Sequence, residues 1–220
     1  MTGRGLSGEV IPALLLKQTD DTESGQQMKR KIPSSGFGKA KKSSRAKPET
    51  AEIETTVTFL SMDHPPSLRV MPPANLKLAL MHVQDPTVSY YRYLYGAVGS
   101  EYYWVDRNLL SDDQLAAVIN AGSIDIYVAY CAGNPAGYFE IDSRDKAKCW
   151  LAYFGLLPEF HGLGIGKWLL SKAVRTAWAG KPETLHVETC TLDAPHALNL
   201  YQKMGFVPYE RRNKTMTVPV

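Results

Sequence analysis

The sequence of 220 residues is poor in cysteine and has no long apolar segment. Its three cysteines, Cys131, Cys149 and Cys190, form no Cys-x-x-Cys pair, which argues against a disulfide framework and against a thiolate zinc site. No apolar run approaches the roughly 18 residues of a membrane-spanning helix, so we expect no membrane association. The apolar patch over residues 10–16 is short, contains a proline and lacks the flanks of a signal peptide. These absences indicate a reducing compartment, and we expect a cytoplasmic location.

Positive charge is concentrated at the N-terminus. Residues 1–51 carry ten basic and five acidic residues, whereas residues 52–220 carry fifteen basic and seventeen acidic residues. The first segment is rich in Ser, Thr, Gly, Lys and Gln and has too little apolar surface to offset the entropy of an ordered chain. We therefore predict a disordered basic tail over residues 1–51 and one folded domain over residues 52–220. A solvated tail is the simplest interpretation, while a weak contact with nucleic acid stays open, as does a homodimer.

Hydrophobic periodicity predicts a domain that mixes helices and strands. Alternating apolar residues indicate strands, and apolar residues spaced by three and four indicate amphipathic helices. The expected strands cover residues 57–60, 76–83, 124–132, 136–141, 148–157, 185–189, 206–209 and 215–218, and the expected helices cover residues 87–98, 111–121, 164–179 and 194–204. Ser111 and Asp193 are expected to cap the second and fourth helices. The order along the chain is a meander followed by β-α-β-α-β.

A glycine-rich loop is expected between the strand at 148–157 and the helix at 164–179. It reads Pro158-Glu159-Phe160-His161-Gly162-Leu163-Gly164-Ile165-Gly166-Lys167. Glycines at alternate positions let consecutive N–H groups turn toward one point, and the start of the helix adds unpaired donors and a positive dipole end. The loop therefore predicts a phosphate or pyrophosphate site. A Walker A loop would need Ser or Thr in place of Trp168, and a Rossmann fingerprint would need glycine in place of Lys167.

Two motifs in this order resemble those of the GNAT superfamily of acetyl-CoA-dependent N-acetyltransferases. The first, Gln/Arg-x-x-Gly-x-Gly/Ala at the start of a helix, corresponds to residues 161–166, with His161 in place of Gln or Arg. The second, a helix with a Leu-Tyr pair that ends in Gly-Phe, corresponds to residues 197–206. The resemblance runs from about Thr56 to the C-terminus and is most specific over residues 148–209. It implies an α+β, layered fold with a mixed, mostly antiparallel sheet, a splayed pair of parallel strands and flanking helices.

The resemblance also implies an activity and a cosubstrate. We expect an acyltransferase that moves an acetyl group from acetyl-CoA, by direct attack, to a primary amine of a small molecule or peptide. The pantetheine arm would lie between the strands at 148–157 and 185–189, with a bulge at Gly155 that frees an amide near Leu156 for the oxyanion. The implied cofactor-binding residues are Leu156, Leu157, His161, Gly162, Leu163, Gly164, Ile165, Gly166 and Lys167. The five histidines show no clustered ligand spacing, so we predict no metal.

Three residues are candidates for proton transfer. Tyr201 matches the tyrosine of the second motif, which implies a general acid for the departing thiolate; a core aromatic is the alternative. Many relatives carry a carboxylate on the strand at 148–157, but this strand has none. Simple alternation would place Trp150, Ala152 and Phe154 on one face and Leu151 and Tyr153 on the other. The candidate bases are therefore Glu140 and Glu188 on neighbouring strands, with a solvated edge or a cross-strand pair as the alternative for both.

Aromatic residues are concentrated over residues 90–104, which hold seven of the 22 in the chain. In the family that the chain resembles, this region forms the acceptor wall, so Tyr103, Trp104 and Arg107 are the implied substrate-binding residues, with Asp106 as a further polar group. An aromatic-packed pair of helices is the alternative. Two other classes of function stay open: a non-catalytic acyl-CoA-binding module with the same fold, and a nucleic-acid-associated protein acetyltransferase that uses the basic tail.

Overall fold

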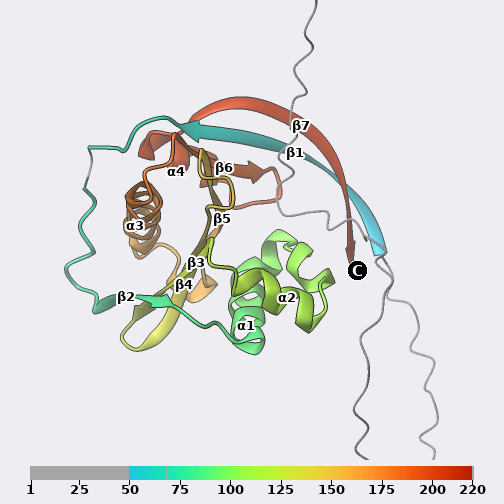
Figure 1. Cartoon of the computed structure of the whole chain (residues 1–220), viewed down its shortest axis with the longest axis horizontal. Helices are drawn as coiled ribbons and strands as arrows, with labels where there is room; N and C mark the ends of the chain where they lie inside the picture. Colours follow the sequence, from blue (N-terminus) through green and yellow to red (C-terminus); the bar gives the residue numbers. More distant parts are fainter. Residues whose placement is uncertain (1–49, 68, 220) are drawn as a thin grey trace, which may run out of the picture.

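The computed structural model describes residues 50–67 and 69–219 (Figure 1). Its strands are β1 (Thr50–Met62), β2 (Leu78–Val83), β3 (Ile124–Cys131), β4 (Asn134–Asp142), β5 (Lys148–Leu156), β6 (Thr184–Cys190) and β7 (Val207–Pro219). Its helices are α1 (Val88–Gly99), α2 (Asp112–Ile119), α3 (Ile165–Ala179) and α4 (Ala197–Met204), with short 3-10 turns η1 (Ser100–Tyr102), η2 (Asp106–Leu109) and η3 (Pro158–Phe160). The predicted tail lies outside the described residues up to residue 49, and β1 begins at Thr50, two residues before the predicted boundary.

The seven strands of the described residues form one sheet in the order β2-β3-β4-β5-β6-β1-β7. All neighbouring pairs are antiparallel except β5 and β6, which are parallel. Helices α3 and α4 cover one face of the sheet, and α1 and α2 cover the other (Figure 1). The predicted fold class, a mixed and mostly antiparallel sheet with flanking helices, is confirmed.

Each face of the sheet has its own apolar core. On the α3 side, the helix presents Leu169, Leu170 and Val174 to the sheet, all fully buried, because their spacing of one and four places them on one face. On the α1 side, the helix buries Tyr91 and Leu94 against β3 and β4. The two cores hold the central strands between rigid layers, so side chains on β5 and β6 have fixed directions.

The first strand lies in the interior of the sheet, next to the last one. β1 pairs with β6 from Val57 to Met62 and with β7 along almost its whole length, so the two ends of the described chain pair with each other. The predicted meander therefore holds for β2 to β5 but is wrong for β1. Residues 63–77 connect β1 to β2, which lies at the opposite edge of the sheet. The alternation of apolar and polar residues in a strand does not indicate which neighbouring strand it pairs with.

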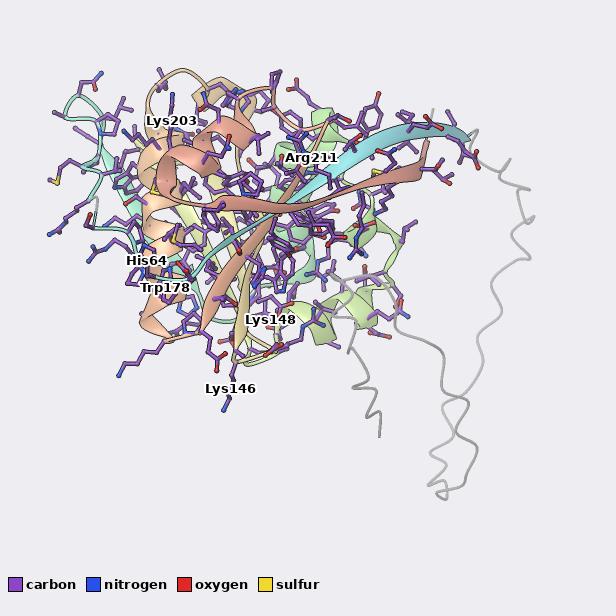
Figure 2. All side chains as sticks on the ribbon, turned by 90° about the horizontal axis from the view of Figure 1, so that it is seen from above. His64, Lys146, Lys148, Trp178, Lys203 and Arg211 are labelled. Carbon is purple, nitrogen blue, oxygen red and sulfur yellow. The ribbon has the colours of Figure 1, made fainter. Side chains whose placement is uncertain are left out.

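Beyond the body, β1 and β7 continue as a two-stranded ribbon (Figures 1 and 2). The pairing of β1 with β6 ends at Val57, whereas its pairing with β7 continues to Thr50. The two short strands predicted at 206–209 and 215–218 are one strand, β7. The polar residues 210–214 resemble a loop in the sequence, but a ribbon with exposed side chains accepts them without a break.

A bulge in β5 reverses the direction of its side chains. Glu140 lies opposite Tyr153 and the next residue of β4 lies opposite Leu151, so Ala152 is the extra residue. Leu151 packs in the α3-side core, as does Phe154, although the two positions have opposite parity. The predicted faces of β5 are therefore wrong, and so is the predicted position of the bulge at Gly155. Gly155 instead permits close approach of α1, because a Cβ there would lie 2.3 Å from Val98 Cγ1.

Of the two predicted helix caps, one is confirmed. Ser111 Oγ accepts from the N–H of Gln114 (3.2 Å), and the Gln114 side chain accepts from the N–H of Ser111, which is a capping box at the start of α2. Asp193 does not cap α4, which begins at Ala197. The Asp193 carboxylate accepts from Thr189 Oγ1 (2.7 Å) and from the N–H of Cys190 (2.9 Å), so it closes the end of β6.

Candidate active site

Strands β5 and β6 separate after three paired positions. The parallel ladder joins residues 148–150 to residues 184–186, and no pair follows, although β5 continues to Leu156 and β6 to Cys190. The splayed pair that the sequence implied is therefore present. Backbone N–H and C=O groups on this edge of β5 have no strand partner in β6, so the gap can pair with an extended ligand that carries amide groups.

A cavity of about 880 Å³ passes through this gap. Tyr201 of α4 lines it from the α3 side of the sheet, and Trp104 and Tyr153 line it from the α1 side. Glu188 of β6 lines it as well. The cavity thus joins the two faces of the sheet at the point where the strands diverge, which allows two ligands to meet from opposite sides.

One end of the cavity is formed by the glycine-rich loop. Gly162 and Gly164 have left-handed backbone conformations, with φ of +75° and +78°, and Gly164 is the N-cap of α3. His161 Nε2 lies 3.1 Å from the carbonyl oxygen of Leu156, which ties the loop to the end of β5. Leu156, His161 and Gly166 line the cavity, whereas residues 162–165 lie outside its lining. The first turn of the 15-residue helix α3 thus reaches the cavity wall at Gly166, and the N–H groups of this turn, which have no intrahelical partner, suit a phosphate group.

The other predicted cofactor residues contribute unequally. The side chain of Ile165 is fully buried in the core, and Leu163 is exposed, so both can act only through their backbone. Lys167 lies in the first turn of α3 and is absent from the cavity lining. The predicted role of Leu157 is wrong. Its N–H donates to the carbonyl of Ala136 (3.0 Å), its carbonyl accepts from the N–H of Phe160 (3.0 Å), and its side chain is buried on the α1 side, so it has no group left for a ligand.

Tyr201 is a buried phenol whose side chain reaches the cavity. Its ring packs edge-on against Phe154 and Phe206, at centroid distances of 6.2 and 5.9 Å, which fixes its direction. Burial raises the pKa of Tyr201 well above its usual value, with a smaller contribution from Asp193. The phenol is therefore protonated at neutral pH and can donate a proton within the cavity.

Glu188 is a carboxylate that faces the cavity from the α1 side. It alternates with Leu185 and Val187, which are buried toward α3, and so it points the other way. The Glu188 side chain is exposed to the open cavity, and its partial burial between the cavity walls raises its pKa; Lys214 opposes this rise, and Asp106 and Asp193 add to it. A carboxylate with a raised pKa accepts a proton more readily than an ordinary one, which suits a general base.

Glu140, the other candidate base, lies outside the cavity lining. It is fully buried, and its two carboxylate oxygens accept from Arg107 Nη2 (2.5 Å) and Tyr91 Oη (2.6 Å). Burial raises the pKa of Glu140, whereas Arg107 and Tyr91 oppose the rise. Arg107 is itself 3% exposed and stacks over the Tyr153 ring at 5.2 Å. Both residues form a buried ion pair behind the cavity wall, so we correct their predicted roles in proton transfer and substrate binding.

Tyr103 and Trp104 do line the cavity, as does Asp106 at the start of η2. Tyr103 has a left-handed backbone (φ 56°), which turns the chain after η1. Trp104 packs on Gly99, where a Cβ would lie 2.5 Å from the Trp104 side chain. The backbone N–H of Trp104 donates to the Gly99 carbonyl. The aromatic segment between α1 and α2 is therefore a wall of the cavity.

Two strands that the sequence did not connect with the site also line it. β1 contributes Val57 and Phe59, and β7 contributes Arg212 and Lys214 among others. These residues share a face because Val57 lies opposite Arg212 in the antiparallel ladder. No motif marks them; the one available signal was the alternation of Val57 and Phe59 within a strand.

Two negative findings apply to residues 50–67 and 69–219. These residues contain no group of three or more His, Cys, Asp or Glu side chains arranged to hold a metal ion. Their helices are all too short or too polar to cross a bilayer.

Comparison with known proteins agrees with this geometry. Residues 122–208 match the family model of the acetyltransferase (GNAT) domain, while no curated protein matches the sequence. Solved structures with a similar fold include a GNAT-family acetyltransferase from Novosphingobium aromaticivorans (15% identity, TM-score 0.52) and GCN5-related N-acetyltransferases from Kribbella flavida (14%, 0.52) and Sphaerobacter thermophilus (14%, 0.53).

These three matches cover 78%, 78% and 79% of this chain but 68%, 60% and 53% of the other chains. The chain therefore spans between about half and two thirds of the length of the structures that it resembles. At such low identity the structures report the fold, and the family model adds the sequence signature over residues 122–208. Together they show that residues 122–208 carry the signature of a GNAT acetyltransferase domain within a GNAT-like fold, which supports acetyl transfer as the general chemistry.

Proposed function

We propose that the protein is an acetyl-CoA-dependent N-acetyltransferase that acts on a primary amine by direct attack. The observation that carries this proposal is one cavity that holds a glycine loop at one end, a protonated phenol at the gap and a carboxylate on the opposite side of the sheet. Acetyl-CoA would supply the activated acetyl group. The loop residues 162–166 would hold its phosphates, and the unpaired edge of β5 would pair with its amide-containing arm.

Two side chains of this protein then take part in proton transfer. An alkylammonium group has a pKa of about 10 and must lose a proton before its nitrogen can attack. Glu188 accepts that proton on the α1 side of the gap. Tyr201 donates its phenolic proton to the departing sulfur on the α3 side. One N–C bond forms and one C–S bond breaks. The second proton that the attacking nitrogen loses passes through water in the open cavity to the Tyr201 phenolate, and Glu188 returns its proton to solvent, so both side chains are restored.

The state of Cys190 favours direct attack over a covalent intermediate. This cysteine lines the cavity, so it is the thiol that a two-step mechanism would use. Burial raises the pKa of Cys190, and Asp193 adds to the rise, which keeps the sulfur protonated and weakly nucleophilic. A protonated thiol of this kind supports direct transfer of the acetyl group from acetyl-CoA to the amine.

Two measurements test the proposal. Isothermal titration with acetyl-CoA should give a measurable affinity, and acetyl-CoA should raise the melting temperature by linkage. Release of free thiol from acetyl-CoA in the presence of a set of primary amines should show turnover. Binding without turnover of any amine would make the chain an acyl-CoA-binding module, and lack of binding at millimolar acetyl-CoA would end the proposal.

A further inference from the structure

The acceptor side of the cavity is mainly aromatic. Rings from three elements (β1, α1 and β5) and from the segment around η1 and η2 face it from the α1 side of the sheet: Phe59, Tyr95, Tyr102, Tyr103, Trp104, Trp150 and Tyr153. Such a wall buries an apolar or aromatic group well, because each ring offers a large flat surface at a low cost in conformational entropy.

These rings are held in place before any ligand binds. Trp104 packs against Tyr95 (5.5 Å between centroids) and Tyr153 (5.2 Å) and is wedged on Gly99. Tyr153 is in turn stacked under the guanidinium of Arg107, whose charge is neutralised by Glu140. The buried ion pair thus supports the wall from behind. A ligand of matching shape would bind without first ordering the wall, which favours affinity.

The charges at the inner end of this wall favour a cation. Asp106 and Glu188 both line the cavity, and the negative charge of Asp106 contributes to the raised pKa of Glu188, so the two carboxylates act on the same space. Of the cations in the lining, Arg144 forms a two-pronged pair with Asp142 (2.5 Å at the shortest) and Arg212 pairs with Glu210, whereas Lys214 only partly offsets the charge of Glu188. An ammonium group placed between the rings and these carboxylates gains both charge pairing and cation–π contact.

From this arrangement we infer the substrate class of the site: a primary amine on an aromatic or bulky apolar body, without an acidic group beside the amine. This inference rests on the proposed acetyltransferase function. The aromatic wall takes the body, Glu188 and Asp106 draw in the ammonium group, and a carboxylate on the carbon next to the amine would be repelled by the same two side chains.

A panel of matched amines tests the inference. Tryptamine, tryptophan, ethanolamine and glucosamine would be compared by kcat/KM from thiol release with acetyl-CoA. We expect kcat/KM for tryptamine to exceed that for ethanolamine by about 100-fold, because burial of the indole ring supplies about the free energy that a 100-fold ratio requires. We expect kcat/KM for tryptamine to exceed that for tryptophan by at least about tenfold. Turnover of the polar amines at an equal or higher kcat/KM, or of tryptophan as well as tryptamine, would overturn the inference and leave the proposed function intact. Absence of turnover with all four amines, and with a broader amine set, would overturn both.

Variants of the wall link the preference to these residues. Tyr103→Asn removes a ring at a position where the left-handed backbone, which asparagine tolerates, is kept. We expect the ratio of kcat/KM for tryptamine to that for ethanolamine to fall about fivefold. The matched control is Tyr93→Asn, because Tyr93 is also an exposed tyrosine but lies on α1 outside the cavity lining; for this variant the ratio should stay as in the parent protein. A ratio that does not change in Tyr103→Asn, or that falls equally in both variants, contradicts the assignment.

Asp106→Asn tests the electrostatic part. It removes a negative charge that raises the pKa of Glu188, so the acidic limb of the pH profile should move to lower pH while KM for tryptamine rises. A purely structural change would lower activity at every pH without moving the limb. An unmoved limb with an unchanged KM would show that Asp106 does not act on the amine.

Discussion

The two ends of the cavity are built from different parts of the chain. The end at α3 uses backbone: two glycines with positive φ, the first turn of a helix and the unpaired edge of β5, all within residues 151–167. The acceptor end uses side chains from β1, β5, β6, β7 and the segment around η1 and η2. Backbone that binds a constant group needs a short contiguous motif, whereas a pocket for a particular substrate is assembled from distant positions.

The largest expected effect is at the backbone end. Gly164→Val places a β-branched residue at φ +78°, which forces the loop to rearrange, so we expect acetyl-CoA binding to fall below detection by calorimetry. Gly133→Val is the matched control, because Gly133 has a similar φ of +89° in the β3–β4 turn and lies outside the cavity lining.

Both glycine variants should lose a comparable stability of about 1–3 kcal/mol from the same backbone strain. Acetyl-CoA should then raise the melting temperature of the Gly133 variant alone. Retained stabilisation by acetyl-CoA in Gly164→Val would show that the loop does not hold the cosubstrate through its backbone.

The second prediction contrasts the two carboxylates on the acceptor side. Glu140→Gln leaves the buried Arg107 guanidinium without its counter-charge, so we expect a loss of about 3 kcal/mol in the free energy of unfolding. Glu188→Gln should leave that free energy almost unchanged, because none of the described contacts pairs Glu188 directly with a cation. Urea denaturation of both variants measures the difference, and equal losses would contradict the assignment of Glu140 to the scaffold.

The same division explains which features could be predicted from the sequence. The glycine loop, the Leu200-Tyr201 pair, the helices α3 and α4 and the fold class follow from contiguous patterns. The position of β1 depends on which strand edges are free after folding, and the faces of β5 depend on one extra residue at Ala152, which no local propensity marks. Glu140 and Glu188 look alike in sequence, and only the tertiary neighbours distinguish a buried ion-pair partner from a cavity-lining carboxylate.

A third prediction concerns the phenol at the gap. Tyr201→Phe keeps the ring that packs between Phe154 and Phe206, so stability and acetyl-CoA affinity should hardly change. Loss of the proton donor should lower kcat by about 100-fold, the low end for general acid catalysis, because a thiolate is already a good leaving group. Steady-state kinetics with any accepted amine provides the measurement. An unchanged kcat, with chemistry rate-limiting, would leave Tyr201 as a core aromatic.

The smallest effect is expected when Glu188, the proposed general base, is replaced. Its pKa is raised by burial, so activity of the parent protein should fall as the pH drops through that raised value, because the protonated carboxyl cannot accept a proton. In Glu188→Gln this limb should disappear and the pH dependence should follow the ionisation of the amine alone. Near neutral pH we expect a loss of about tenfold in kcat, below the usual range for a general base because water in the open cavity can take the proton.

At alkaline pH the amine reaches the site uncharged, so the parent protein and Glu188→Gln should converge there. The measurement is kcat against pH for both proteins with the same amine. A constant ratio of the two kcat values across the whole pH range would mean that Glu188 shapes the pocket without moving a proton. The side chains of the acceptor end would then contribute to binding alone. Convergence at high pH would assign to the side-chain end both the choice of amine and its deprotonation.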